Sequence, residues 1–232
     1  MHVFNFLLFY PIFMSIYWIV GSIYYFFIKE KPFNRSLLVK SEHQQVEGIS
    51  FLLACYNESE TVQDTLSSVL SLEYPEKEII IINDGSSDNT AEIIYDFKKN
   101  HDFKFVDLEV NRGKANALNE GIKQASYEYV MCLDADTVID DDAPFYMIED
   151  FKKNPKLGAV TGNPRIRNKS SILGKIQTIE YASIIGCIKR SQSLAGAINT
   201  ISGVFTLFKK SALKDVGYWD TDMITEDIRS EE

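Results

Sequence analysis

The sequence predicts an α/β fold, in which a mostly parallel sheet is flanked by helices and preceded by one N-terminal transmembrane helix. Three observations favour this fold class. From Ile49 onward, strand-like apolar runs alternate with segments of helical periodicity. Acidic motifs directly follow three of the strand-like runs. No charged residue occurs between Val3 and Ile28, a stretch rich in Phe, Tyr, Ile and Leu.

The N-terminal apolar run is long enough to cross a membrane. As a helix it extends about 39 Å at 1.5 Å per residue, which exceeds the thickness of a bilayer core. A secretory signal is the alternative, but signal cores are shorter and follow basic residues. No Lys or Arg precedes this run, and Lys29, Lys31, Arg35 and Lys40 follow it.

The basic residues after the run set the expected orientation. Lys and Arg are enriched on the cytoplasmic side of membrane spans, so the rest of the chain is expected in the cytoplasm, at the cell membrane. We therefore expect a transmembrane helix at 1–28, a juxtamembrane linker at 29–48 and a cytoplasmic domain at 49–232.

The strands and helices of the domain are predicted from hydrophobic patterns. Ile49 to Cys55 is an apolar run typical of a strand buried on both faces. Ile79 to Ile82 are four consecutive isoleucines, the strongest β signal in the chain. Further strands are expected at 103–110, 127–133, 157–161 and 201–208, and helices at 59–74, 88–99, 114–125, 144–153 and 171–194. Strand–helix alternation indicates parallel pairing with right-handed crossovers.

Charge and cysteine content exclude some classes of function. The net charge of −9 argues against a nucleic-acid partner, because that binding requires basic surface to neutralise phosphates. Cys55, Cys132 and Cys187 are odd in number, lie in apolar surroundings and lack the spacing of metal ligands. Buried, reduced thiols are expected.

The acidic motifs suggest a site for a metal ion and a phosphate ester. Successive parallel strands bring their carboxyl ends to one sheet edge, where open α/β sheets bind ligands. Asp134 and Asp136 form an Asp-X-Asp motif after a strand. Such a pair suits Mg²⁺ or Mn²⁺, since Mg²⁺ takes one or two carboxylates together with substrate phosphates. A solvated turn is the alternative, because acidic residues also occupy 140–142.

Two other strand ends carry residues suited to a nucleotide. Asp84 follows the isoleucine strand, and its carboxylate could accept a hydrogen bond from a uracil imide. Alternatively, it shapes the turn there or caps the following helix. After the first strand, Tyr56 could stack on a base and Glu58 could bind ribose. Alternatively, Asn57 caps the next helix and Glu58 is an acid in its first turn.

Charged groups outside the strand ends add two further candidates. Lys114 follows Gly113 at a helix start, a combination that attracts anions, although a surface charge pair is the alternative. Thr225-Glu226-Asp227 supplies a carboxylate that could act as a general base. Its alternative is an ordinary acidic loop.

These motifs together resemble the processive family-2 glycosyltransferases of the Rossmann-like GT-A fold, and most closely those that make bacterial biofilm exopolysaccharide. The family pattern is a membrane-associated enzyme with an Asp, an Asp-X-Asp, a Thr-Glu-Asp and a Gln-X-X-Arg-Trp. The runs that carry the resemblance are FLLACYNESE, IIIINDGSSDNTAE, NRGKANALN, CLDADT, TGNPRIRNKSS and YWDTDMITEDI.

The resemblance implies a role for each matching position. The nucleotide sugar would be bound by Tyr56, Glu58, Asp84, Lys114 and Asp134. The divalent cation would be held by Asp134 and Asp136. Asp227 would be the catalytic base, Glu226 would line the acceptor site, and Ser202 and Gly203 would face the acceptor sugar.

The reaction implied by the resemblance is inverting and metal-dependent. N-acetylglucosamine would pass from UDP-N-acetylglucosamine to a growing β-1,6-linked polysaccharide acceptor. Membrane lipid would surround the enzyme, and the family pattern also allows a small membrane-protein subunit as a partner.

The sequence departs from the family pattern in its last part. It contains no Gln-X-X-Arg-Trp, and it ends five residues after Asp227. We therefore expect a C-terminally truncated form that binds UDP with metal but makes little polymer. The alternatives are a transferase for hyaluronan, chitin or a lipid-linked sugar, a metal-dependent nucleotidyltransferase, and an inactive remnant that only binds UDP or a partner.

Overall fold

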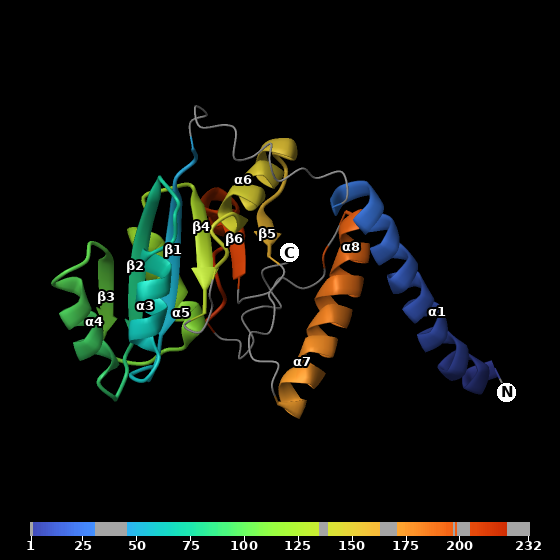
Figure 1. Cartoon of the computed structure of the whole chain (residues 1–232), viewed down its shortest axis with the longest axis horizontal. Helices are drawn as coiled ribbons and strands as arrows, with labels where there is room; N and C mark the ends of the chain where they lie inside the picture. Colours follow the sequence, from blue (N-terminus) through green and yellow to red (C-terminus); the bar gives the residue numbers. More distant parts are fainter. Residues whose placement is uncertain are drawn as a thin grey trace. The chain divides into compact units, whose positions relative to one another are not determined.

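The chain forms two compact units. The computed structural model describes residues 2–30, 46–134, 139–162, 171–196, 198 and 205–221 (Figure 1). One unit, here called the helical unit, combines 1–42 with 163–200. The other, here called the sheet unit, combines 43–162 with 201–232.

The sheet unit is built on a mixed sheet of six strands in the order β3-β2-β1-β4-β6-β5 (Figure 1). β1 pairs in parallel with β2 and β4, and β2 pairs in parallel with β3. β6 runs antiparallel to both β4 and β5. The predicted mostly parallel sheet is therefore confirmed, with the antiparallel pairs confined to one side. The strands are β1 (Ile49–Cys55), β2 (Lys77–Asp84), β3 (Lys104–Leu108), β4 (Tyr129–Leu133), β5 (Ala159–Thr161) and β6 (Phe205–Lys209).

Helices cover both faces of this sheet because its strands are apolar on both faces. In β2, Ile79 and Ile81 join the buried cluster of one face, and Ile80 and Ile82 join that of the other. The first cluster includes residues of α3 (Val62–Leu70), α4 (Thr90–Lys98) and α6 (Ala143–Lys153). The second includes residues of α5 (Lys114–Gln124) and α9 (Lys210–Asp215).

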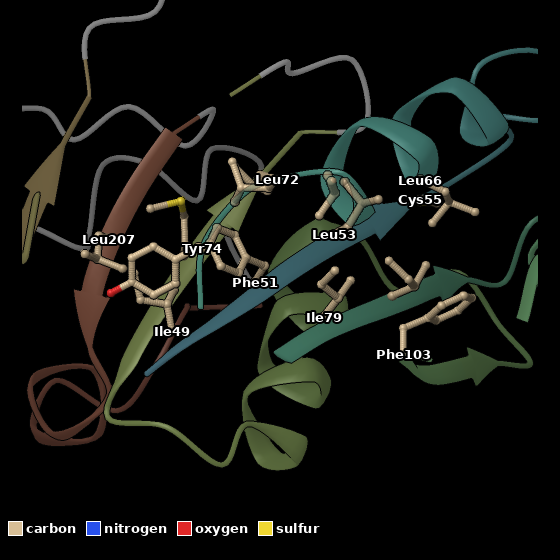
Figure 2. Close-up of a cluster of buried hydrophobic side chains, with 14 of the residues drawn as sticks. Ile49, Phe51, Leu53, Cys55, Leu66, Leu72, Tyr74, Ile79, Phe103 and Leu207 are labelled. Atoms are coloured by element: carbon tan, nitrogen blue, oxygen red, sulfur yellow. The ribbon is translucent and has the colours of Figure 1, made fainter. Parts of the chain in front are cut away.

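Figure 2 shows the first of these clusters. Phe51 and Leu53 project from β1 and are fully buried. The rings of Phe51 and Tyr74 meet edge to face, 6.4 Å apart. Burying one such large apolar side chain stabilises the fold by about 2 kcal/mol. The strands that end at the acidic motifs are therefore fixed by the core of the unit.

The cysteines differ in their surroundings. Cys55 and Cys132 are buried in β1 and β4, as expected, and burial raises the pKa of each thiol to about 12. Cys187 is only half-buried and lies in the helical unit. All three are free thiols.

The helical unit is formed by two long helical segments. The first is α1 (His2–Tyr25), continued by the π-helical η1 (Phe26–Glu30). The second was expected as one helix at 171–194. It consists of α7 (Ile172–Ser183), the π-helical η2 (Ile184–Lys189) and α8 (Arg190–Leu194). The hydrophobic pattern did not predict this π-helical interruption.

Small and hydroxyl side chains hold α1 against the second segment. A Cβ on Gly21 would lie 2.5 Å from Ser191 Oγ, so only glycine allows this approach. Ser191 Oγ donates to the carbonyl of Trp18 at 2.8 Å, and Ser22 Oγ donates to that of Gly186 at 2.8 Å. Arg190 and Glu30 form an ion pair at 2.7 Å. The polar groups at this helix contact are therefore paired.

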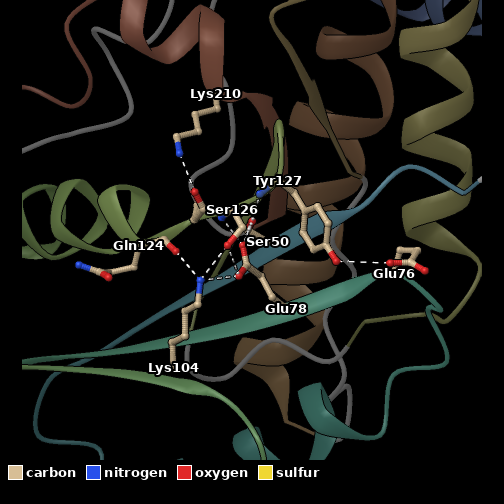
Figure 3. A network of polar contacts seen from close by, with 9 residues as sticks. Ser50, Glu76, Glu78, Lys104, Gln124, Ser126, Tyr127 and Lys210 are labelled. Atoms are coloured by element: carbon tan, nitrogen blue, oxygen red, sulfur yellow. Dashed lines mark hydrogen bonds and ion pairs between the residues drawn. The ribbon is translucent and has the colours of Figure 1, made fainter.

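A carboxylate network fastens the amino ends of the central strands (Figure 3). Glu78 of β2 accepts hydrogen bonds from Ser50 Oγ at 2.5 Å and Ser126 Oγ at 3.0 Å, and it pairs with Lys104 at 2.7 Å. The backbone N–H of Ser126 also donates to it. Although partial burial opposes ionisation, these donors together lower the pKa of Glu78 to about 2. The network thereby joins β1, β2, β3 and the segment before β4.

We predict that Glu78→Gln destabilises the sheet unit by about 2 kcal/mol at pH 7, because a partly buried ion pair and its hydrogen bonds are lost. The pKa of Glu78 is depressed on folding, so its stabilisation is present above about pH 4.5 and is lost as the pH falls towards 2. Urea unfolding in detergent, followed by the fluorescence of buried Trp219 in a Trp18→Phe background, measures this difference.

Glu76→Gln is the matched control. Glu76 is exposed, and its carboxylate accepts a long hydrogen bond from the Tyr127 hydroxyl, 3.4 Å away. Its substitution should change the free energy of unfolding by less than about 0.5 kcal/mol. Equal effects of the two substitutions at pH 7, or an effect of Glu78→Gln that is as large at pH 2 as at pH 7, would contradict the assignment.

Candidate active site

The carboxyl ends of β2, β1 and β4 lie side by side at one edge of the sheet. Cys55 pairs with Asn83, and Leu53 pairs with Leu133. The residues that end or follow these strands are Asp84, Tyr56 and Asp134. Neighbouring strands are about 4.8 Å apart, so Asp84 and Asp134, which flank β1, are separated by on the order of 10 Å across the sheet. The structure therefore brings these predicted residues to a common edge.

Asp84 is fixed in the strand and still has an acceptor atom to offer. It is the last residue of β2 rather than the first of the turn, and it is 3% exposed. Its Oδ1 accepts a hydrogen bond from the backbone N–H of Arg112 at 3.1 Å. Oδ2 accepts none from the residues that the structure describes. Because α4 begins at Thr90, Asp84 is not a helix cap.

Lys114 reaches the other carboxylate. It is the first residue of α5, and its Nζ lies 2.5 Å from Asp134 Oδ1. Both side chains are about one-third exposed, at 30% and 28%. Lys114 thus forms a charge pair, the alternative named above, and this pair is made with Asp134 of the Asp-X-Asp motif at the strand ends. Residues 112–114 contact the end residues of both β2 and β4.

Gly85 allows this segment to approach β2. Its φ is +63°, a left-handed conformation, and a Cβ here would lie 2.4 Å from the backbone nitrogen of Asn111. Asn83 supports the same turn by accepting a hydrogen bond from Ser86 Oγ at 2.5 Å and by donating to Asp107 at 2.7 Å. A side chain at residue 85 would push the Asn111 backbone away.

The loop after β1 is bound to the loop after β2. Asn57 has a φ of +53°, and its Oδ1 accepts from the backbone N–H of Ser87 at 2.8 Å. The expected alternative, in which Asn57 caps α3, is wrong because α3 begins at Val62 and Asn57 is engaged by the other loop. Glu58 donates its backbone N–H to Thr90 Oγ1 at 2.8 Å, and Tyr56 is half exposed.

Five predicted residues lie outside the described parts of the chain: Asp136, Ser202, Gly203, Glu226 and Asp227. Among the described residues, no three His, Cys, Asp or Glu side chains gather in a way that could hold a metal ion. Asp134 is the described member of the expected pair. Its carboxylate, at an exposed sheet edge, fits a hard cation that takes most other ligands from phosphates and water.

A contact that the sequence did not reveal fixes the segment leading toward residues 225–227. Asn119 of α5 donates its Nδ2 to the carbonyl of Trp219 at 2.8 Å, and its Oδ1 accepts from the Trp219 N–H at 3.1 Å. The Trp219 ring also meets Phe208 edge to face, 5.4 Å away. The helix that begins with Lys114 therefore also holds Trp219.

Comparison with known proteins identifies close relatives. The family model for glycosyl transferase family 2 matches residues 50–217. Over 228 residues the chain is 99% identical to a poly-β-1,6-N-acetyl-D-glucosamine synthase of Staphylococcus epidermidis and 77% identical to one of Staphylococcus aureus strain COL. Each match covers 98% of this chain and 55% of the relative. The chain thus spans about half the length of the curated relatives it matches.

Solved structures share the fold at low sequence identity. A mannosyltransferase, PcManGT from Pyrobaculum calidifontis in complex with GDP-Man and Mn²⁺, has a TM-score of 0.65 at 20% identity, over 94% of this chain and 60% of that one. Staphylococcus aureus TarS 1–349 in complex with UDP-GlcNAc has a TM-score of 0.55 at 19% identity, over 78% of this chain and 51% of that one.

Gly85→Ala is predicted to destabilise the sheet unit by about 3 kcal/mol, because the added Cβ collides with the Asn111 backbone. Gly217→Ala is the control. Its φ of +83° is also left-handed, but a Cβ there meets no atom of the described residues within 4 Å, so it should cost about 1 kcal/mol. Urea unfolding followed by Trp219 fluorescence compares them. Equal losses of unfolding free energy would show that backbone strain at a left-handed φ explains both variants, and that the close approach of the Asn111 backbone to Gly85 contributes nothing.

Proposed function

Because the chain belongs to glycosyl transferase family 2, we propose that it transfers N-acetylglucosamine from UDP-N-acetylglucosamine to a growing β-1,6-linked polysaccharide. The 99% identity to a poly-β-1,6-N-acetyl-D-glucosamine synthase supports the choice of sugar and linkage. The observation that carries the proposal is the pair of fixed carboxylates, Asp84 and Asp134, joined by residues 112–114 at one sheet edge.

The nucleoside is proposed to lie over the ends of β1 and β2. Asp84 Oδ2 would accept a hydrogen bond from the imide N–H of uracil. The half-exposed Tyr56 ring would stack on the base, since aromatic faces attract planar rings. Glu58 accepts from Thr61 Oγ1 through Oε2, which leaves Oε1 for a ribose hydroxyl, as no other described residue donates to it.

The diphosphate is proposed to lie between α5 and β4. The N-terminus of α5 and the Lys114 ammonium both favour an anion. Asp134 and Asp136 would hold Mg²⁺ or Mn²⁺, which supplies charge neutralisation to the UDP leaving group. The mannosyltransferase of the same fold was solved with Mn²⁺ and a nucleotide sugar.

The acceptor side is proposed from the remaining motif positions. Asp227 would take the proton from the 6-hydroxyl of the acceptor sugar, with Glu226 lining the acceptor site. Ser202 and Gly203 would face the same sugar. The hydroxyl oxygen would attack the anomeric carbon opposite the leaving UDP, so that an α-linked donor gives a β-linked product.

Calorimetry with UDP-N-acetylglucosamine in the presence of Mn²⁺ tests the proposed donor site on the whole chain. Binding is expected, and Asp84→Asn should weaken it about 10- to 100-fold, because the carboxylate acceptor of a charge-assisted hydrogen bond is lost. Asp136→Ala should abolish the dependence on Mn²⁺.

Asp64→Asn is the matched control for charge, since Asp64 is exposed in the first turn of α3 and is not one of the proposed binding residues. It should leave affinity unchanged. Absence of binding by the wild-type chain, or equal affinities of the Asp84→Asn and Asp64→Asn variants, would reject the proposed site.

We further propose that α1 spans the cell membrane and that the sheet unit is cytoplasmic. The candidate span runs over 25 residues, Phe6–Glu30; its most apolar 18-residue window has a mean hydropathy of 1.8, and no part of that window is buried in the described chain. Lys29, Lys31 and Arg35 follow its apolar part, which favours a cytoplasmic exit. In the same unit, Ile172, Ile176 and Ile179 on α7 are at least 56% exposed and suit contact with lipid.

Protease protection tests this orientation. In inside-out membrane vesicles the sheet unit should be digested without detergent, whereas in intact right-side-out vesicles it should survive. The protein should also resist extraction at alkaline pH and keep its original N-terminus. Protection in inside-out vesicles would reverse the orientation, and cleavage after the apolar run would identify a signal sequence instead.

A further inference from the structure

Asp88, in the loop between β2 and α4, binds the loop that follows β1. Its Oδ2 accepts a hydrogen bond from the backbone N–H of Ser59 at 3.1 Å. Its Oδ1 accepts from the backbone N–H and the hydroxyl of Thr90, at 3.0 Å and 2.5 Å. Both oxygens are therefore engaged, Oδ2 by the loop after β1 and Oδ1 by the first residue of α4.

Thr90 extends this connection to the next peptide. It is fully buried, and its Oγ1 accepts from the backbone N–H of Glu58 at 2.8 Å. Because the Thr90 hydroxyl donates its proton to Asp88, its lone pair is directed to Glu58. The two successive N–H groups of Glu58 and Ser59 thus depend on one carboxylate and one hydroxyl.

An ordinary helix cap does not account for this arrangement. The N-cap residue of α4 is Asn89, whose side chain makes no capping bond. Asp88 does bind the first residue of α4, but its second oxygen binds Ser59 of the other loop, which capping does not require. The hydrogen bonds from Thr90 and Ser59 also lower the pKa of Asp88 to about 2, so it is ionised at neutral pH.

The held loop contains a residue in the left-handed region. Asn57 has a φ of +53°, which is uncommon for residues other than glycine. Tyr56 and Glu58, the residues proposed to meet the base and the ribose, flank it. We propose that Asp88 is a positioning residue of the nucleotide site, which acts with Thr90 to keep Tyr56 and Glu58 facing the nucleoside. This inference rests on the proposed function.

The test compares Asp88→Asn with Glu92→Gln in the whole chain. Glu92 is exposed in the first turn of the same helix, so its substitution removes the same charge near the same helix end without touching the β1 loop. For Asp88→Asn we expect about tenfold weaker binding of UDP, a loss typical of a small displacement of binding groups. Binding of pyrophosphate with Mn²⁺, which lacks the nucleoside, should be unchanged.

Thr90 variants provide a second arm. Thr90→Ser keeps the hydroxyl and should bind UDP normally, whereas Thr90→Val keeps the shape and should lose affinity as Asp88→Asn does. Hydrogen exchange of the ligand-free chain provides a third arm, in which the amides of Glu58 and Ser59 should exchange faster in Asp88→Asn than in Glu92→Gln.

Two results would overturn the inference. One is an unchanged UDP affinity in Asp88→Asn, and the other is an equal loss for UDP and pyrophosphate, which would indicate general destabilisation. If the wild-type chain binds no UDP, the proposed function fails. Hydrogen exchange then still tests whether Asp88 holds the loop after β1. Unchanged exchange of the Glu58 and Ser59 amides in Asp88→Asn would show that it does not.

Discussion

The site depends on one short segment, residues 112–114, that contacts two carboxylates from different strands. The backbone N–H of Arg112 holds Asp84 at the end of β2, and the ammonium of Lys114 holds Asp134 after β4. These two donors fix the positions of both carboxylates at one sheet edge. Gly85 makes the contact possible because the Asn111 backbone occupies the space of its missing Cβ.

The rest of the sheet unit keeps that edge rigid. The isoleucines of β2 are buried on both faces, so β2 cannot shift without disturbing two clusters. Glu78 fastens the opposite end of the same strand, and Asp88 fastens the loop that follows β1. Loops that carry proposed binding groups are thus supported by buried strands and by paired polar groups, which is the arrangement that preorganised sites require.

The sequence predicted the parts of the fold that local patterns determine. The runs at β1 and β2 are long and apolar, so both strands could be predicted. Because the carboxyl ends of parallel strands share one edge of the sheet, the grouping of Tyr56, Asp84 and Asp134 followed from the order of the motifs along the chain. The direction of β6 could not be predicted in this way. A five-residue apolar run has the same pattern whether the strand pairs in parallel or antiparallel. Contacts between residues far apart in sequence, such as Asn119 with Trp219, leave no periodic signal. Capping by Asn57 stayed open as an alternative because Asn suits both caps and left-handed turns.

The central claim is that Asp84 and Asp134, held by one segment, receive the two ends of a nucleotide diphosphate. A crystal structure of the chain with UDP-N-acetylglucosamine and Mn²⁺, with manganese located by its anomalous signal, tests this most directly. Uracil should lie within hydrogen-bond distance of the Asp84 carboxylate, and manganese should be bound through Asp134. Nucleotide bound away from this sheet edge, or manganese on other ligands, would contradict it.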